Sequence, residues 1–127
     1  MDPTNKGTIL IVEDDEFLRS LTAKRLEKDG YIPVVAVDGD GAINVALESK
    51  PRLILLDLLL PGIDGFEVLK RIRANEQLKN LPVIVFSNLG QSKYLEKATQ
   101  LGADDFLIKS NSTLDDLMVK INTKLSK

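Results

Sequence analysis

Polar side chains follow several short apolar runs of the sequence, and together they offer an unusual set of chemical groups. The residues are Glu13, Asp14, Asp57, Ser87 and Lys109. Three carboxylates within about 5 Å repel by roughly 1 kcal/mol per pair in water and about 3–4 kcal/mol at an effective dielectric near 20. A bound Mg²⁺ would relieve this repulsion, while a hydroxyl and an ammonium could bind an anion. Such a set predicts phosphoryl transfer with Asp57 as the nucleophile.

The composition excludes many other chemistries. The chain of 127 residues contains no cysteine and no histidine, so disulfides, thiol catalysis, histidine bases and histidine-ligated metals are excluded. Lys and Arg total 17 against 19 Asp and Glu, a net charge of −2, which argues against direct binding of nucleic acid. No glycine-rich nucleotide-binding motif occurs, and the Asp57-Leu58-Leu59 segment lacks the second aspartate of aspartate-based phosphohydrolases.

Apolar runs rich in β-branched residues alternate with longer amphipathic runs, which indicates a parallel sheet covered by helices on both faces. We expect strands at Thr8–Val12, Ile32–Val37, Arg52–Asp57, Pro82–Phe86 and Asp105–Ile108. We expect helices at Glu16–Lys28, Gly41–Ser49, Asp64–Ala74, Lys93–Leu101 and Thr113–Leu125, with Ser112 and Asp115 at capping-box spacing. If the first and third strands are neighbours, the acidic residues converge at the carboxyl ends of the strands.

Each polar residue also has a simpler explanation when it is taken alone. The acidic run Glu13–Asp15 could cap a helix, and a single aspartate after a strand is commonly a turn residue. Ser87 could begin a helix, and Lys109 could be a solvated surface lysine. The functional interpretation therefore depends on the residues occurring together.

The sequence resembles the receiver domains of bacterial two-component response regulators. In length it is similar to the stand-alone regulators of this family, including the chemotaxis type. Four segments between Thr8 and Leu125 carry the resemblance: Ile9–Asp15, Leu55–Gly65, Pro82–Ser87 and Gly102–Lys109. It implies a flavodoxin-like α/β fold, a doubly wound five-stranded parallel sheet of order 2-1-3-4-5 with helices on both faces. We expect one receiver domain over residues 1–127, with a flexible segment at 1–7, no output domain and no membrane segment, in the cytoplasm.

The resemblance implies that Asp57 accepts a phosphoryl group from a sensor histidine kinase or a phosphotransfer protein. It implies Mg²⁺ bound by Asp14, by Asp57 and by the backbone carbonyl of Leu59, with Glu13 acting mostly through a metal-bound water. The protein would promote only its own phosphorylation and dephosphorylation, so we do not expect an enzyme. The alternative is an interaction module of the same fold that works without phosphorylation.

The resemblance also implies that Ser87, Lys109 and the backbone N–H of Asn88 bind the phosphoryl oxygens. Ser87 and Phe106 would act as the switch, changing the surface of the fourth helix, fifth strand and fifth helix that an unknown output protein reads. The sequence departs from the family pattern at three positions. Ser110 follows the lysine where the family usually has a cis proline, Asn88 replaces a small residue, and Leu89 is apolar where polar residues are common. We expect a trans Lys109–Ser110 bond.

Overall fold

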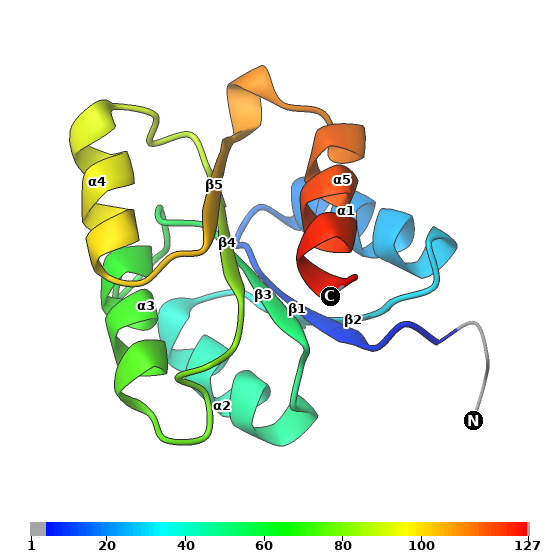
Figure 1. Ribbon diagram of the computed structural model, residues 1–127, viewed down its shortest axis with the longest axis horizontal. Coiled ribbons are helices and arrows are strands. Elements are labelled where there is room, and N and C mark those ends of the chain that lie inside the picture. The colour runs from blue at the N-terminus through cyan, green and yellow to red at the C-terminus, as the bar shows by residue number, and fades with distance from the viewer. Residues whose placement is uncertain (1–4, 127) are drawn as a thin grey trace.

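The computed structural model describes residues 5–126, in which five strands form one sheet of order β2-β1-β3-β4-β5 (Figure 1). The strands are β1 (Thr8–Val12), β2 (Ile32–Ala36), β3 (Leu53–Leu56), β4 (Val83–Ser87) and β5 (Asp105–Ile108). All neighbouring strands pair in parallel, so their carboxyl ends lie along one edge of the sheet. The predicted fold class and strand order are confirmed.

Helices cover both faces of this sheet (Figure 1). One face carries α1 (Glu16–Lys28) and α5 (Leu114–Leu125). The other face carries α2 (Gly39–Ser49), α3 (Gly65–Ala74) and α4 (Ser92–Gln100). Each connection between parallel strands therefore crosses one face or the other, and the loops at the carboxyl edge are held by packed elements on both sides.

The residues of the central strands point alternately into two hydrophobic cores. Ile9 and Ile11 of β1 pack with the α1 and α5 side chains, whereas Leu10 and Val12 pack with those of α2 and α3. Burying one such side chain stabilises the fold by about 1.5–3 kcal/mol. Because β3 and β4 are buried on both faces, their sequences are continuous apolar runs rather than alternating ones.

Four helix starts, those of α2, α3, α4 and α5, differ from the sequence prediction by one or two residues. Helix α2 begins at Gly39 rather than Gly41, because the Asp38 side chain accepts a hydrogen bond from the Gly41 N–H at 2.7 Å and acts as the N-cap. The capping box of α5 uses Thr113 and Asp116, one residue later than predicted. A 3₁₀ turn at Lys109–Asn111, which the sequence analysis did not predict, precedes this box.

The expected flexible segment at 1–7 lies partly outside the described residues, which exclude 1–4. Within the described part, the Lys6 N–H donates to the carbonyl of Gly30 at 2.9 Å, which ties this segment to the start of β2. The described residues contain no cis peptide bond, so the Lys109–Ser110 bond is trans as predicted. None of the described helices is both long enough and apolar enough to cross a membrane.

Candidate functional site

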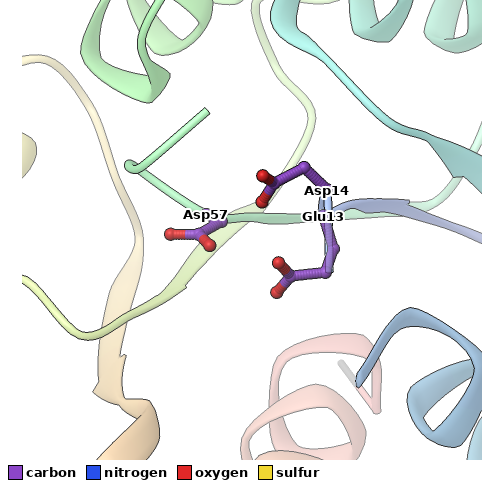
Figure 2. A group of neighbouring side chains, drawn as sticks. All are labelled: Glu13, Asp14 and Asp57. Carbon is purple, nitrogen blue, oxygen red and sulfur yellow. The ribbon is translucent and has the colours of Figure 1, made fainter. Parts of the chain in front are cut away.

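Three carboxylates meet where β1 and β3 end. Figure 2 shows Glu13, Asp14 and Asp57 gathered at this point, and one oxygen of each lies within 4.8 Å of the others. Glu13 and Asp57 are buried, whereas Asp14 is exposed. The structure therefore brings together the three acidic residues that the sequence analysis placed at the carboxyl edge of the sheet.

The carboxylate of Asp57 accepts three hydrogen bonds. Its Oδ1 atom accepts from the Ser87 hydroxyl at 2.7 Å and from the Leu59 N–H at 3.0 Å, and its Oδ2 atom accepts from Lys109 Nζ at 2.6 Å. Ser87 is fully buried, so its hydroxyl has a fixed position at the end of β4. The structure thus brings Ser87 and Lys109, which the sequence analysis predicted as phosphoryl-binding residues, into contact with the Asp57 carboxylate.

Lys109 lies between two buried carboxylates, because its Nζ atom also donates to Glu13 Oε1 at 2.5 Å. Burial raises the pKa of Glu13, and the neighbouring ammonium offsets only part of that rise. Burial lowers the pKa of Lys109, but its hydrogen bonds to Asp57 and Glu13 outweigh burial, and the net shift of the pKa is upward. Lys109 therefore stays an ammonium, and it bonds to two carboxylates of a cluster of three.

The three acidic residues after β1, Glu13, Asp14 and Asp15, have different roles. Asp15 is the N-cap of α1, since its side chain accepts a hydrogen bond from the Leu18 N–H at 3.1 Å. Asp15 also donates its own N–H to Glu13 Oε2 at 3.2 Å. Helix capping thus explains Asp15 alone, and Glu13 and Asp14 remain available to the site.

Arg19 is a site residue that the sequence analysis missed. Its Nη1 atom donates to the carbonyls of Glu13 and Asp14, at 3.1 and 3.3 Å. This guanidinium fixes the backbone of the loop that carries both carboxylates. The only sequence signal was a basic residue one turn into an expected helix, which is common on solvated helix faces.

Gly65 determines the path of the chain after Asp57. A Cβ atom at Gly65 would lie 2.5 Å from both the Asp57 carbonyl oxygen and the Leu58 Cα atom. Helix α3, whose N-cap is Asp64, therefore begins in direct contact with the backbone of Asp57 and Leu58. Only glycine permits this approach, because the atoms that a side chain would meet belong to the backbone.

The remaining predicted residues lie at the rim of the site. Leu59 has a side chain that is 52% exposed, and Phe106 packs half-buried against the cluster of Leu58, Phe66, Val85 and Ala98. Asn88 is exposed, and its side chain accepts a hydrogen bond from the Ser110 N–H at 2.9 Å. The roles expected of the Leu59 carbonyl, the Asn88 N–H and the Phe106 ring stay predictions.

The donor set of the acidic cluster fits a hard divalent cation. Its side-chain ligands are carboxylate oxygens, the atoms that Mg²⁺ prefers in proteins. Two of the carboxylates are buried and share a single ammonium, so negative charge remains for a cation to balance. The cluster can therefore hold a metal ion beside Asp57.

Curated relatives of this sequence are transcriptional regulators that are much longer than the chain. The chain is 41% identical over 101 residues to the DNA-binding dual master transcriptional regulator RpaA of Synechocystis, covering 80% of the chain and 42% of the relative. It is 36% identical over 101 residues to the phosphate regulon transcriptional regulatory protein PhoB of Escherichia coli, covering 80% and 44%. The chain thus spans less than half the length of these relatives.

Solved receiver domains have the same fold. The receiver domain of the sensor histidine kinase PA1611 from Pseudomonas aeruginosa, with a magnesium ion coordinated in its active site cleft, superposes with a TM-score of 0.86 at 26% identity, covering 95% and 98% of the two chains. The BeF3-activated receiver domain of Klebsiella pneumoniae RstA superposes with a TM-score of 0.87 at 29% identity, covering 94% and 99%. The model of the response regulator receiver domain family matches residues 9–122, and the chain belongs to this family.

Proposed function

We propose that this protein is a phospho-acceptor switch in which Asp57 takes a phosphoryl group from a phosphohistidine on a sensor histidine kinase or a phosphotransfer protein. The observation that carries the proposal is the arrangement around Asp57. Its carboxylate lies within 4.8 Å of carboxylate oxygens of Glu13 and Asp14, and it accepts hydrogen bonds from Ser87 and Lys109. A nucleophile, cation ligands and anion donors then share one small site.

The proposed step moves one phosphoryl group between two covalent partners. An oxygen of the Asp57 carboxylate forms a bond to phosphorus while the bond between phosphorus and the histidine nitrogen breaks. The leaving imidazole keeps the electron pair of that bond and takes up a proton. Asp57 is suited to this attack because its position is fixed by the Leu59 N–H and the Ser87 hydroxyl.

The negative charge of the incoming group must be balanced within the site. Asp14, Asp57 and Glu13 would hold Mg²⁺, with the Leu59 carbonyl as a further ligand. When bound, this ion supplies charge neutralisation between the Asp57 carboxylate and the phosphoryl oxygens. Lys109 supplies the second positive charge, and the Ser87 hydroxyl and the Asn88 N–H supply hydrogen bonds to the phosphoryl oxygens.

Phosphorylation would change the contacts that Asp57 makes in the structure described above. Ser87 and Lys109 now contact the carboxylate, and both would transfer their hydrogen bonds to the phosphoryl group. Ser87 ends β4, and Phe106 lies on the paired strand β5. We therefore propose that the shift of Ser87 changes the packing of Phe106 and the α4–β5–α5 surface that an output protein reads.

Incubation with acetyl phosphate and Mg²⁺, followed by intact mass spectrometry, tests the proposed function. We expect the wild-type protein to gain the mass of one phosphoryl group, and Asp57→Ala to gain none. A matched control is Asp38→Ala, because Asp38 also lies after a strand but only caps α2. Wild-type protein that gains no phosphoryl group would favour the alternative, an interaction module that works without phosphorylation.

A further inference from the structure

The loops that follow β4 and β5 are joined by a side chain. Asn88 lies directly after Ser87, and its Oδ1 atom accepts a hydrogen bond from the backbone N–H of Ser110 at 2.9 Å. Ser110 lies directly after Lys109. The bond therefore links the neighbours of two groups that surround Asp57, across 22 positions of sequence.

This link lies beyond the end of the sheet. The pairing of β4 with β5 ends at Ser87 and Ile108, so Lys109 lies just beyond the last paired residue of β5. Among the described residues, the Asn88–Ser110 bond is the one hydrogen bond that joins the backbone of 109–112 to the loop after β4. The loop after β4 also touches the end of β5 at Gly90, where a Cβ atom would lie 2.9 Å from the Ile108 side chain.

The backbone at Lys109 must be held in place for its ammonium to reach both carboxylates. Lys109 has a long side chain, and its Nζ atom must reach Glu13 at 2.5 Å and Asp57 at 2.6 Å. Within its own turn, the Lys109 carbonyl accepts only a long hydrogen bond of 3.4 Å from the Ser112 N–H. The bond to Asn88 exists because residue 110 has a backbone N–H, which a proline would lack.

We propose that Asn88 is a positioning residue for Lys109, holding the trans Lys109–Ser110 peptide so that the ammonium stands between Glu13 and Asp57. Because Asn88 is covalently attached to Ser87, the same bond makes the two donors move together when Asp57 is modified. The expected effect on the phosphorylation rate rests on the proposed function. The position of the Lys109 ammonium, in contrast, can be measured without phosphorylation. Asn88 acts here through its side chain, separately from its backbone N–H.

The first experiment measures the rate at which Asp57 gains a phosphoryl group from acetyl phosphate at saturating Mg²⁺. Asn88→Leu keeps the size of the side chain but removes the acceptor, and we expect the rate to fall about tenfold, less than the roughly 10²-fold loss expected for a 1 Å misplacement. The matched control is Asn111→Leu in the same turn, whose exposed side chain makes no hydrogen bond among the described residues. A rate for Asn88→Leu equal to that of wild type would overturn the proposal.

The second experiment asks whether Asn88 acts through Lys109. In a Lys109→Ala background we expect Asn88→Leu to cause no further loss, because there is no ammonium left to position. A further tenfold loss would show that Asn88 acts independently of Lys109 and would refute the positioning role. Ser110→Pro removes the donor, and we expect it to lower the rate as Asn88→Leu does, with no added loss when the two are combined.

A third measurement separates failure of this inference from failure of the proposed function. The NMR signal of the Lys109 ammonium should be slow to exchange with water in the wild type and in Asn111→Leu, and fast to exchange in Asn88→Leu. This result supports the positioning role even if the wild-type protein gains no phosphoryl group, which would overturn the proposed function alone. An unchanged ammonium signal in Asn88→Leu overturns the inference whatever the phosphorylation result.

Discussion

The strands β4 and β5 carry a network of charged groups at each end, and the two networks differ in how well their charges are matched. At the carboxyl end, the Lys109 ammonium bonds to the buried carboxylates of both Glu13 and Asp57. At the amino end, the guanidinium of Arg73 meets Asp104 at 3.0 Å. The first network has an excess of negative charge, and the second does not.

The amino-end network satisfies nearly every donor and acceptor it contains. Arg73 donates to the carbonyls of Lys79, Leu81 and Gly102, at distances between 2.6 and 3.0 Å. Asp104 accepts from the Val83 N–H at 2.8 Å as well as from Arg73. A planar guanidinium can make all these bonds at once, so α3 and the starts of β4 and β5 are locked together.

The carboxyl-end network is left with unused binding capacity. Asp14 adds a third carboxylate, and its side chain accepts no hydrogen bond among the described residues. Lys109 bonds to the two buried carboxylates, and the Arg19 guanidinium bonds only to the carbonyls of Glu13 and Asp14 among the groups of this site. Repulsion among these carboxylates disfavours the metal-free fold and favours a bound cation. The matched charges at the amino end thus stabilise the packing of α3 against the sheet, whereas the unmatched charges at the carboxyl end form a site that can bind a cation and react.

The largest expected effect is loss of the amino-end network. Arg73→Ala should lower the free energy of unfolding by about 2–3 kcal/mol, because it leaves three carbonyls without their donor and takes the guanidinium away from Asp104. Urea unfolding followed by circular dichroism measures this change. Arg73→Lys should recover only part of the loss, since an ammonium cannot reproduce the fork of the guanidinium. A lysine variant as stable as wild type would show that the fork geometry does not matter.

Two glycines allow the comparison to be tested with matched substitutions. Gly65→Ala forces a Cβ atom against the backbone of Asp57, and Gly102→Ala places one 2.7 Å from the Arg73 side chain at a φ of +102°. Each should lower the free energy of unfolding by about 1–3 kcal/mol. Only Gly65→Ala should also slow phosphorylation of the folded protein, as measured by intact mass. Equal slowing in both variants would mean that the two ends are not independent.

The smallest expected effect is the response to Mg²⁺. At ten times its dissociation constant, a ligand that binds only the folded state adds about 1.4 kcal/mol to the free energy of unfolding. The melting temperature should therefore rise with millimolar Mg²⁺, and rise less in Asp14→Asn. Arg73→Lys should show the wild-type rise, because its network is remote from the metal ligands. Equal rises in wild type and Asp14→Asn would refute the assigned metal site.

The sequence by itself determined the sheet and the residues gathered at its carboxyl edge. Runs such as Leu53–Leu56 are apolar throughout because both faces of a parallel sheet are covered, which makes them recognisable. Once the strands are parallel, whatever follows each strand lies at one edge, so Asp57, Ser87 and Lys109 could be placed together from local patterns. Helix starts were less certain: α2 begins two residues before the predicted Gly41, and the capping box of α5 uses Thr113 rather than the neighbouring Ser112.

Only the tertiary structure decided which contacts hold these residues in place. Arg73 and Asp104 are 31 positions apart, and Asn88 and Ser110 are 22 apart. Arginine and asparagine are common on solvated surfaces, and their long or polar side chains have no periodic signature that reveals a distant partner. Close approaches such as Gly65 against Asp57 also depend on how two elements pack. The physical reason is that a buried strand needs a run of apolar residues, which can be recognised in the local sequence. A hydrogen bond between side chains or loops that are distant in sequence needs two groups to be close in space, and only the folded chain brings them together.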